Sequence, residues 1–345
     1  MARQKNILVT GGLGYIGSHT TVELLNKGYH VHIIDDLSNS SLDVLDGIKK
    51  ITGQVPPYDI FSLENKEKVF QAFAKNNFDA IIHFAAFKAV GESVEKPLLY
   101  YRNNLNSLIN VLDAALNFGT KNIVFSSSCT VYGQPEEKDL PVTENSPIVA
   151  ANSPYGNTKQ ISEEIIADFI KANPQFSAIL LRYFNPIGAH PSGFIGELPK
   201  GVPNNLVPFI MQTAIGLRPE LKVFGSDYNT PDGTAIRDYI DIMDLVDAHI
   251  VAVERLTEMK TKKNVEAFNL GTGKGSTVLE VIKTFEQITG QKLNYKIVGR
   301  RPGDIEKVWA DTSLANKELG WKAKRTLADS LETAWKWEQY YRNQE

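Results

Sequence analysis

The sequence predicts an α/β protein, with a doubly wound parallel sheet in its first part and a smaller C-terminal α/β domain. Two patterns support this prediction. Short apolar runs alternate with longer amphipathic stretches up to residue 182, which is typical of βαβ units around a parallel sheet. The stretch 188–203 then breaks the rhythm, because glycine and proline recur in it, so a second domain is expected to begin there.

Each element of the first part follows from a local pattern. Apolar runs indicate buried strands, and amphipathic stretches that end at glycine indicate helices. In chain order, the sequence predicts a strand at 7–9, a helix at 18–27, a strand at 31–35, a helix at 66–75, a strand at 80–84, a helix at 98–118, a strand at 122–126, a helix at about 158–172 and a strand at 178–181.

The second part is less regular. It predicts helices at 208–216, 243–256, 278–289 and 327–341, with a turn at 271–275. The last helix carries two Trp residues and is expected to pack on the body of the protein. The expected domains are 1–185, to which 237–258 returns, and 186–345.

The composition excludes several classes of protein. The 345 residues are 42% hydrophobic and 22% charged, as in an ordinary globular protein. The net charge of -3 argues against a nucleic-acid binder, because the phosphate backbone requires a surplus of Lys and Arg. The single cysteine, Cys129, cannot form an intrachain disulfide or a thiolate metal site, so we expect no metal and a cytoplasmic location. No run approaches the roughly 18 apolar residues that a membrane span requires.

A glycine-rich loop lies between the first predicted strand and the first predicted helix. Thr10-Gly11-Gly12-Leu13-Gly14-Tyr15-Ile16-Gly17 allows close approach of the backbone to a pyrophosphate at the helix start, which indicates a Rossmann-like dinucleotide site. Asp35 ends the second strand, where a carboxylate binds the adenosine ribose hydroxyls. The Asp35 carboxylate would repel the 2′-phosphate of NADP, and no Arg that could bind this phosphate follows directly in the sequence. NAD is therefore favoured over NADP.

A phenol and an ammonium lie four residues apart, so Tyr155 and Lys159 share one face of a helix start. Three serines, 126–128, follow the preceding strand, and the carboxyl ends of strands are where α/β sheets place their chemistry. Taken alone, such serines are equally typical of a turn.

Longer motifs surround these residues. They read His83-Phe84-Ala85-Ala86-Phe87-Lys88-Ala89-Val90-Gly91-Glu92-Ser93, Ser126-Ser127-Ser128-Cys129-Thr130-Val131-Tyr132-Gly133, Ser153-Pro154-Tyr155-Gly156, Leu181-Arg182-Tyr183-Phe184-Asn185-Pro186 and Arg237-Asp238-Tyr239-Ile240. With them, nearly the whole chain resembles the extended branch of the short-chain dehydrogenase/reductase superfamily, and within it the UDP-glucose 4-epimerases.

The resemblance implies interconversion of UDP-glucose and UDP-galactose in galactose metabolism. Carbon 4 would be oxidised by tightly held NAD, the 4-keto sugar would rotate, and hydride would return to its other face. Tyr155 would be the base, Lys159 would favour its phenolate and bind the nicotinamide ribose, and Ser128 would hold the sugar oxygen. By the same resemblance, the helix at 98–118 and the helix after Tyr155 would form a homodimer contact.

The resemblance also implies two sets of binding residues. The cofactor set comprises Gly11, Gly14, Tyr15, Ile16, Gly17, Asp35, Asn39, Asp59, Ile60, Phe84, Ala85, Lys88, Asn103, Ser126, Tyr155, Lys159 and Tyr183. The substrate set comprises Lys88, Ser128, Tyr155, Phe184, Asn185, Asn205, Leu206, Phe224, Arg237, Tyr239, Arg301, Asp304 and Val308. Arg237 and Arg301 suit the diphosphate, because the guanidinium fork matches phosphate oxygens.

Val308 departs from those epimerases that carry a bulky Tyr against carbon 2 of the sugar. We hypothesise that the smaller side chain leaves room for an N-acetyl group, although Val is also an ordinary packing residue. Three other functions stay open: a UDP-glucuronate 4-epimerase, a non-catalytic NAD-binding sensor, and a sugar-nucleotide 4,6-dehydratase. The last would need an acidic pair where Cys129 and Thr130 stand.

Overall fold

The structure, a computed structural model, describes residues 3–301 and 305–343. The chain forms two compact units. Unit 1 comprises Met1–Gly133, Pro147–Arg182 and Val246–Phe268, and unit 2 comprises Gln134–Ser146, Tyr183–Leu245 and Asn269–Glu345. The segment that returns to unit 1 therefore begins at Val246, later than the predicted 237, because residues 236–241 pair with strands of unit 2. Gln134–Ser146 joins unit 2 because Val142 bridges to Ala310, a long-range contact that no local pattern predicts.

A seven-stranded sheet forms the centre of unit 1, in the order β11-β6-β5-β4-β1-β2-β3. The pairs β1–β2, β1–β4, β2–β3 and β4–β5 are parallel, and the order reverses between β1 and β4. This arrangement confirms the predicted doubly wound, Rossmann-like sheet. The strands are β1 (Asn6–Thr10), β2 (His30–Asp35), β3 (Tyr58–Ile60), β4 (Ala80–His83), β5 (Asn122–Ser128), β6 (Ser177–Tyr183) and β11 (Val265–Leu270).

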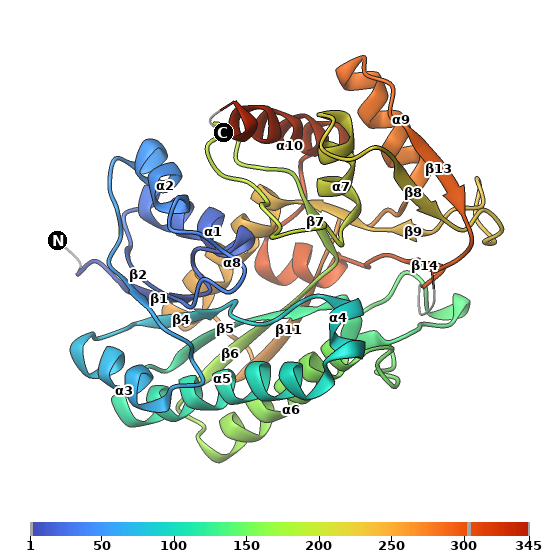
Figure 1. The fold of residues 1–345 in the computed structure, drawn as a ribbon. Coiled ribbons are helices and arrows are strands. Elements are labelled where there is room, and N and C mark those ends of the chain that lie inside the picture. The colour runs from blue at the N-terminus through green and yellow to red at the C-terminus, as the bar shows by residue number, and fades with distance from the viewer. Residues whose placement is uncertain (1–2, 302–304, 344–345) are drawn as a thin grey trace. The chain divides into compact units, whose positions relative to one another are not determined.

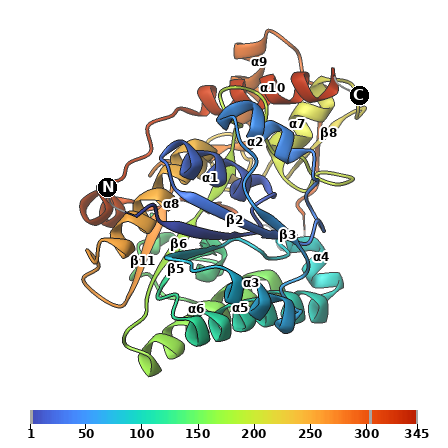
Figure 2. The same ribbon diagram turned by 90° about the vertical axis from the view of Figure 1, so that its left-hand side faces the viewer.

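Helices cover both faces of this sheet (Figures 1 and 2). One face carries α3 (Lys66–Lys75), α5 (Pro97–Phe118) and α6 (Pro154–Ala172), and the other carries α1 (Tyr15–Asn26) and α8 (Ile242–Thr257). The core between the sheet and the first face includes Leu8, Ile81, Val111, Phe125 and Ile166. Two short helices, α2 (Val44–Thr52) and α4 (Val90–Glu95), were not predicted.

Unit 2 is built from short strands and three longer helices. Its helices are α7 (Leu206–Ala214), α9 (Val278–Thr289) and α10 (Leu327–Arg342), and Ile210, Phe285 and Leu331 are fully buried in its core. Its strands are β7 (Asn185–Ile187), β8 (Leu221–Phe224), β9 (Ile236–Arg237), β10 (Tyr239–Asp241), β12 (Ser276–Thr277), β13 (Tyr295–Val298) and β14 (Lys307–Val308). Along the described chain, no helix has the length and apolar character needed to cross a membrane.

Candidate active site

The glycine loop of unit 1 leaves no room for side chains at two positions. A Cβ atom at Gly17 would lie 2.1 Å from the carbonyl oxygen of Gly11, and one at Gly11, where φ is +69°, would lie 2.9 Å from the Ala85 amide nitrogen. Helix α1 begins at Tyr15, three residues before the predicted start, and has no side-chain cap and no acidic residue in its first turn. Its amides and positive dipole end therefore suit a pyrophosphate, and the residues present fit a dinucleotide.

Asp35 holds this loop in place. It is 7% exposed, and its carboxylate accepts hydrogen bonds from Leu13 N (3.0 Å), Leu37 N (2.9 Å) and Ser40 Oγ (2.7 Å). A carboxylate has about four acceptor positions, so one remains for a ribose hydroxyl. Ile60 is the register partner of Asp35 in the β2–β3 pair, which places the predicted adenine contact beside the predicted ribose contact. Asn39 lies in the exposed turn after β2, and Asp59 pairs with His32 at 2.8 Å.

The start of α6 is set by local signals. Ser153 caps the helix by accepting a hydrogen bond from Gly156 N at 3.2 Å, and Pro154 occupies the first turn. Gly156 packs closely here, because a Cβ atom at this position would lie in tight contact, 3.3 Å from the carbonyl oxygen of Thr130. This packing holds the first turn of α6, which carries Tyr155, against the turn that follows Ser128.

Lys159 lies beneath this turn and is 4% exposed. Its Nζ donates a hydrogen bond to the carbonyl oxygen of Ser126 at 2.6 Å and lies 6.0 Å from the centroid of the Tyr155 ring. Ser128 is 7% exposed, and its Oγ accepts from Thr130 N at 3.2 Å. The structure thus gathers the predicted hydroxyl, phenol and ammonium groups around the carboxyl end of β5.

Burial changes the acid–base properties of this cluster. Desolvation lowers the pKa of Lys159 to about 8, and the nearby Glu163 carboxylate offsets part of that decrease. Burial, with a smaller effect of the Lys159 charge, lowers the pKa of His83 to about 3, so this histidine is neutral at working pH. Lys159 is therefore a buried ammonium group that loses its proton close to physiological pH.

The pKa of Lys159 predicts a decline in turnover at alkaline pH. Above about pH 8 the ammonium group deprotonates, and the positive charge that favours a Tyr155 phenolate is lost. We expect kcat to fall roughly tenfold per pH unit beyond this point. The test measures kcat over about pH 6 to 10. The Lys159→Arg variant, which stays protonated, should show a lower rate without the decline, and an unchanged wild-type rate up to pH 10 would contradict the prediction.

The remaining predicted cofactor residues of unit 1 lie after β4 or on α5. Phe84 N donates to the carbonyl oxygen of Thr10 at 3.0 Å, which holds Phe84 and Ala85 beside the glycine loop. Lys88 is exposed, and its Nζ lies 5.9 Å from the centroid of the Tyr15 ring. Asn103 is buried on α5 and donates to the side chain of Asn104 at 3.0 Å.

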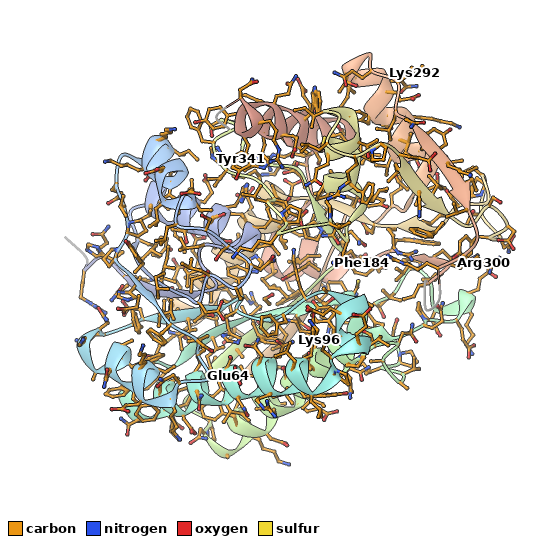
Figure 3. All side chains as sticks on the ribbon, viewed as in Figure 1. Glu64, Lys96, Phe184, Lys292, Arg300 and Tyr341 are labelled. Atoms are coloured by element: carbon orange, nitrogen blue, oxygen red, sulfur yellow. The ribbon has the colours of Figure 1, made fainter. Side chains whose placement is uncertain are left out.

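In unit 2 the predicted substrate residues form two pairs. Val308 on β14 is the register partner of Arg237 on β9, and Val308 is 4% exposed. The Arg301 guanidinium lies 5.7 Å from the centroid of the Phe224 ring. Arg300, labelled in Figure 3, forms an ion pair with Asp227 at 2.8 Å.

The other predicted substrate residues have separate surroundings. Asn185 N donates to the carbonyl oxygen of Asp238 at 2.9 Å, and the exposed Asn205 donates to Glu197 at 2.9 Å immediately before Leu206 opens α7. Tyr239 packs in the core of unit 2. Phe184 is also buried, as is the predicted cofactor residue Tyr183 at the end of β6. Asp304 lies outside the described residues.

Sequence reasoning missed Asp238, which lies between two predicted substrate residues in the motif 237–240. Its fully buried carboxylate accepts hydrogen bonds from Thr272 N and Oγ1 (2.8 Å each), Gly273 N (3.3 Å) and Ala310 N (3.1 Å). Burial raises its pKa. Asp238 therefore joins the 271–273 turn and the segment after Val308 to β9. In the sequence, only its position between Arg237 and Tyr239 pointed to a role for Asp238.

A buried ion pair beneath Lys159 was also missed. Glu163, one turn after Lys159, accepts from Arg182 Nε (2.9 Å) and a terminal nitrogen of Arg182 (2.6 Å), and from Ser127 Oγ. Arg182 also donates to the Tyr132 hydroxyl at 3.0 Å. This network ties α6 to β5 and β6 directly below the predicted catalytic groups.

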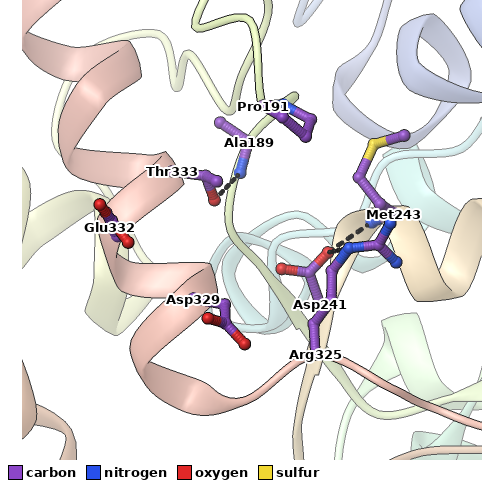
Figure 4. A pocket seen from close by; sticks show the side chains of 8 residues that line it. All are labelled: Ala189, Pro191, Asp241, Met243, Arg325, Asp329, Glu332 and Thr333. Atoms are coloured by element: carbon purple, nitrogen blue, oxygen red, sulfur yellow. Dashed lines mark hydrogen bonds and ion pairs between the residues drawn. The ribbon is translucent and has the colours of Figure 1, made fainter.

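A cavity of about 250 Å³ in unit 2 contains none of the predicted site residues (Figure 4). Its polar lining includes Asp241, Arg325, Asp329, Glu332 and Thr333. Asp241 accepts from Met243 N at 2.8 Å and Ser330 Oγ at 2.7 Å, and Arg325 pairs with Asp244 at 2.5 Å. These contacts join α10 to β10 and the segment before α10 to the start of α8.

Comparisons with known proteins agree with this geometry. A family model described as GDP-mannose 4,6 dehydratase matches residues 8–334. UDP-glucose 4-epimerase 2 of Arabidopsis thaliana is 50% identical over 96% of this chain and 95% of its own length. UDP-glucose 4-epimerase of Bacillus subtilis is 50% identical over 96% of each chain. The crystal structure of UDP-glucose 4-epimerase from Bifidobacterium longum, in complex with NAD+ and UDP, is 46% identical and has a TM-score of 0.94 over 98% of this chain and 99% of that one. The resemblance inferred from the motifs is confirmed, and the chain belongs to the UDP-glucose 4-epimerase family.

Proposed function

We propose that this protein interconverts UDP-glucose and UDP-galactose with a retained NAD. The observation that carries the proposal is the cluster at the carboxyl end of β5, where Lys159 donates to Ser126 and lies 6.0 Å from the Tyr155 ring. The relative from Bifidobacterium longum, whose structure contains NAD+ and UDP, supports the choice of cofactor and nucleotide. The absence of side chains at Gly11 and Gly17 supports a dinucleotide beside this cluster.

Bound NAD supplies a hydride acceptor that can also return the hydride. Tyr155 removes the proton of the carbon 4 hydroxyl and gives it back after the 4-keto sugar has rotated. A free phenol has a pKa of about 10, and lowering it by about three units requires roughly 4 kcal/mol of preferential stabilisation of the anion. The Lys159 ammonium contributes to this stabilisation, and Ser128 holds the same sugar oxygen in position.

Rotation of the keto sugar requires that the nucleotide stays anchored. In unit 2, Arg237 and Arg301 have the side chain suited to a diphosphate, and Phe224 presents a 36% exposed ring beside Arg301 for the uracil base. Asp238 supports these substrate residues because it joins β9 to the turn at 271–273 and to the segment after Val308. We assign these residues to the UDP moiety.

The proposal is tested by incubating the purified protein with UDP-galactose and no added NAD. UDP-glucose should form, because the cofactor stays bound between turnovers. A protein that binds NAD without turning over UDP-galactose or UDP-glucose would refute the proposal and favour a sensor. Formation of a 4-keto-6-deoxy sugar would instead favour a 4,6-dehydratase. We do not expect this product, because Cys129 and Thr130 stand where a dehydratase needs an acidic pair. Turnover of UDP-glucuronate alone would favour a UDP-glucuronate 4-epimerase.

We propose that the enzyme also accepts N-acetylated UDP-sugars, because Val308 is small where some epimerases carry Tyr. Val308 is buried as the register partner of Arg237, and by the resemblance it faces carbon 2 of the sugar, where a Tyr would fill the space for an N-acetyl group. The Val308→Tyr variant should lose at least roughly tenfold in kcat/KM for UDP-N-acetylgalactosamine, with little change for UDP-galactose. Equal activity of wild type and variant on the N-acetylated substrate would contradict the proposal.

We also propose a homodimer through α5. Apolar side chains are exposed along this helix, with Leu98 at 72%, Ile109 at 41% and Leu116 at 45%. Such a row on one helix is typical of a surface that a second copy covers. Light scattering should give the mass of two chains, and a monomer at micromolar concentration would contradict the dimer.

A further inference from the structure

The buried Lys159 ammonium group uses one of its three protons within the described chain. Its Nζ donates to the carbonyl oxygen of Ser126 at 2.6 Å, and this acceptor carries no charge. Glu163, one helical turn further along α6, attracts the ammonium group, but its carboxylate is already bound by Arg182 and Ser127. Because a buried charge needs a partner, another group of the site must contribute to its support.

The ring of Phe125 on β5 lies where it can give this support. Lys159 Nζ is 4.8 Å from the centroid of the Phe125 ring, within the about 6 Å over which an aromatic face attracts a cation. The Tyr155 ring is further away, at 6.0 Å. Phe125 is 2% exposed, so water does little to screen the attraction. The shorter contact of the ammonium group with an aromatic ring is therefore the one with Phe125.

Phe125 is held in turn by the neighbouring strands of the sheet. Its register partner on β4 is His83, and the two rings stack with their centroids 6.1 Å apart and an angle of 16° between their planes. His83 shares a hydrogen bond of 2.9 Å with the hydroxyl of Thr10, its own register partner on β1. A row of side chains thus crosses three adjacent strands, from the residue before the glycine loop to Lys159.

We propose that Phe125 is a positioning residue that holds the Lys159 ammonium group through the face of its ring. This inference rests on the proposed function, in which Lys159 favours the Tyr155 phenolate and binds the nicotinamide ribose. A carboxylate in place of the ring would take up N–H protons and offset the positive charge that acts on Tyr155. The ring supports the charge and leaves two of the three ammonium protons for the ribose hydroxyls.

The direction of the expected effect follows from the groups around Lys159. In the described chain these titratable groups are Tyr155 and Glu163 on α6, with Arg182 on β6 bound to Glu163, and His83 on β4. Burial keeps His83 neutral, so it does not repel the ammonium group. Weakening the attraction of the ring removes stabilisation from the charged form of Lys159 alone, and the pKa of Lys159 should fall below its value of about 8.

The test replaces Phe125 by phenylalanine that carries one, two or three fluorine atoms on the ring. Fluorine draws electron density away from the ring face and weakens its attraction for a cation, while the shape of the ring is nearly kept. The matched control is the same series at Phe176, which lies in the same core, is 1% exposed and packs edge-on against Phe169.

The measurements are made on the protein with NAD bound. The titration of Lys159 is followed by NMR of protein with isotope-labelled lysine ε-carbons, and the Lys159 signal is identified by its loss in the Lys159→Arg variant. The pH dependence of kcat for UDP-galactose and the thermal midpoint are recorded for each protein. The Phe125→Leu variant, which removes the ring but keeps an apolar side chain, is measured in the same way.

We expect the pKa of Lys159 to fall stepwise along the Phe125 series, by roughly one pH unit with three fluorine atoms and by at least as much in Phe125→Leu. The alkaline decline in kcat should move to lower pH by the same amount, and the Phe176 series should change neither quantity. An unchanged pKa of Lys159 with three fluorine atoms at Phe125, or an equal decrease in the Phe176 series, overturns the inference. Since the NMR titration does not depend on turnover, wild-type protein that leaves UDP-galactose unchanged refutes only the proposed function.

Discussion

Replacement of Tyr155 by Phe is expected to lower kcat for UDP-galactose by about 100- to 10,000-fold, the usual contribution of a general acid–base group. The substitution removes only the phenolic oxygen, so the ring keeps its place above Lys159. The buried Lys159 is engaged with the Ser126 carbonyl oxygen, so we expect Tyr155 to be the group of this cluster that accepts the proton. The rate is measured with substrate in excess, alongside the NAD content of the purified variant.

The cofactor content serves as the internal control for this prediction. Tyr155→Phe should retain NAD and have a thermal midpoint close to that of wild type, because the side chain is only half-buried in the first turn of α6 and the substitution keeps its ring. A variant with full NAD content and a rate within about tenfold of wild type would show that the proton is handled by another group.

Replacement of Glu163 by Gln is expected to lower the free energy of unfolding by about 3–5 kcal/mol, because it leaves a buried guanidinium without its counter-charge. The Glu163 and Arg182 side chains are each 8% exposed and form two hydrogen bonds. Urea unfolding of the variant, followed by far-UV circular dichroism, measures the change.

The exposed ion pair between Lys66 and Asp113 is the matched control in unit 1. Its side chains are 57% and 43% exposed, so Asp113→Asn should cost less than about 1 kcal/mol. The double variant Glu163→Met with Arg182→Met should recover much of the loss, since it also removes the guanidinium that Glu163→Gln leaves without its counter-charge. A Glu163→Gln variant as stable as Asp113→Asn would rule out the buried pair as a main support of α6.

Local patterns predicted one helix in each unit with its exact bounds. The helix at 66–75 and the helix at 278–289 have the predicted bounds, because their amphipathic residues lie between clear end signals. Helix α1 begins earlier than predicted because the glycine loop enters the helix at Tyr15 without a side-chain cap to mark the start. Strands β9, β12 and β14 have two residues each, too few for any periodicity to indicate them.

The sequence by itself determined the fold class, the family and the identity of the predicted catalytic groups. These depend on local spacing: glycines between a strand and a helix, and Tyr155 four residues before Lys159. Only the tertiary structure decided which side chains support them. Glu163, Arg182 and Asp238 act through partners as much as 72 residues away. Such contacts exist only after the chain has folded. Folding buries these polar side chains, and a buried polar group needs a hydrogen-bond partner.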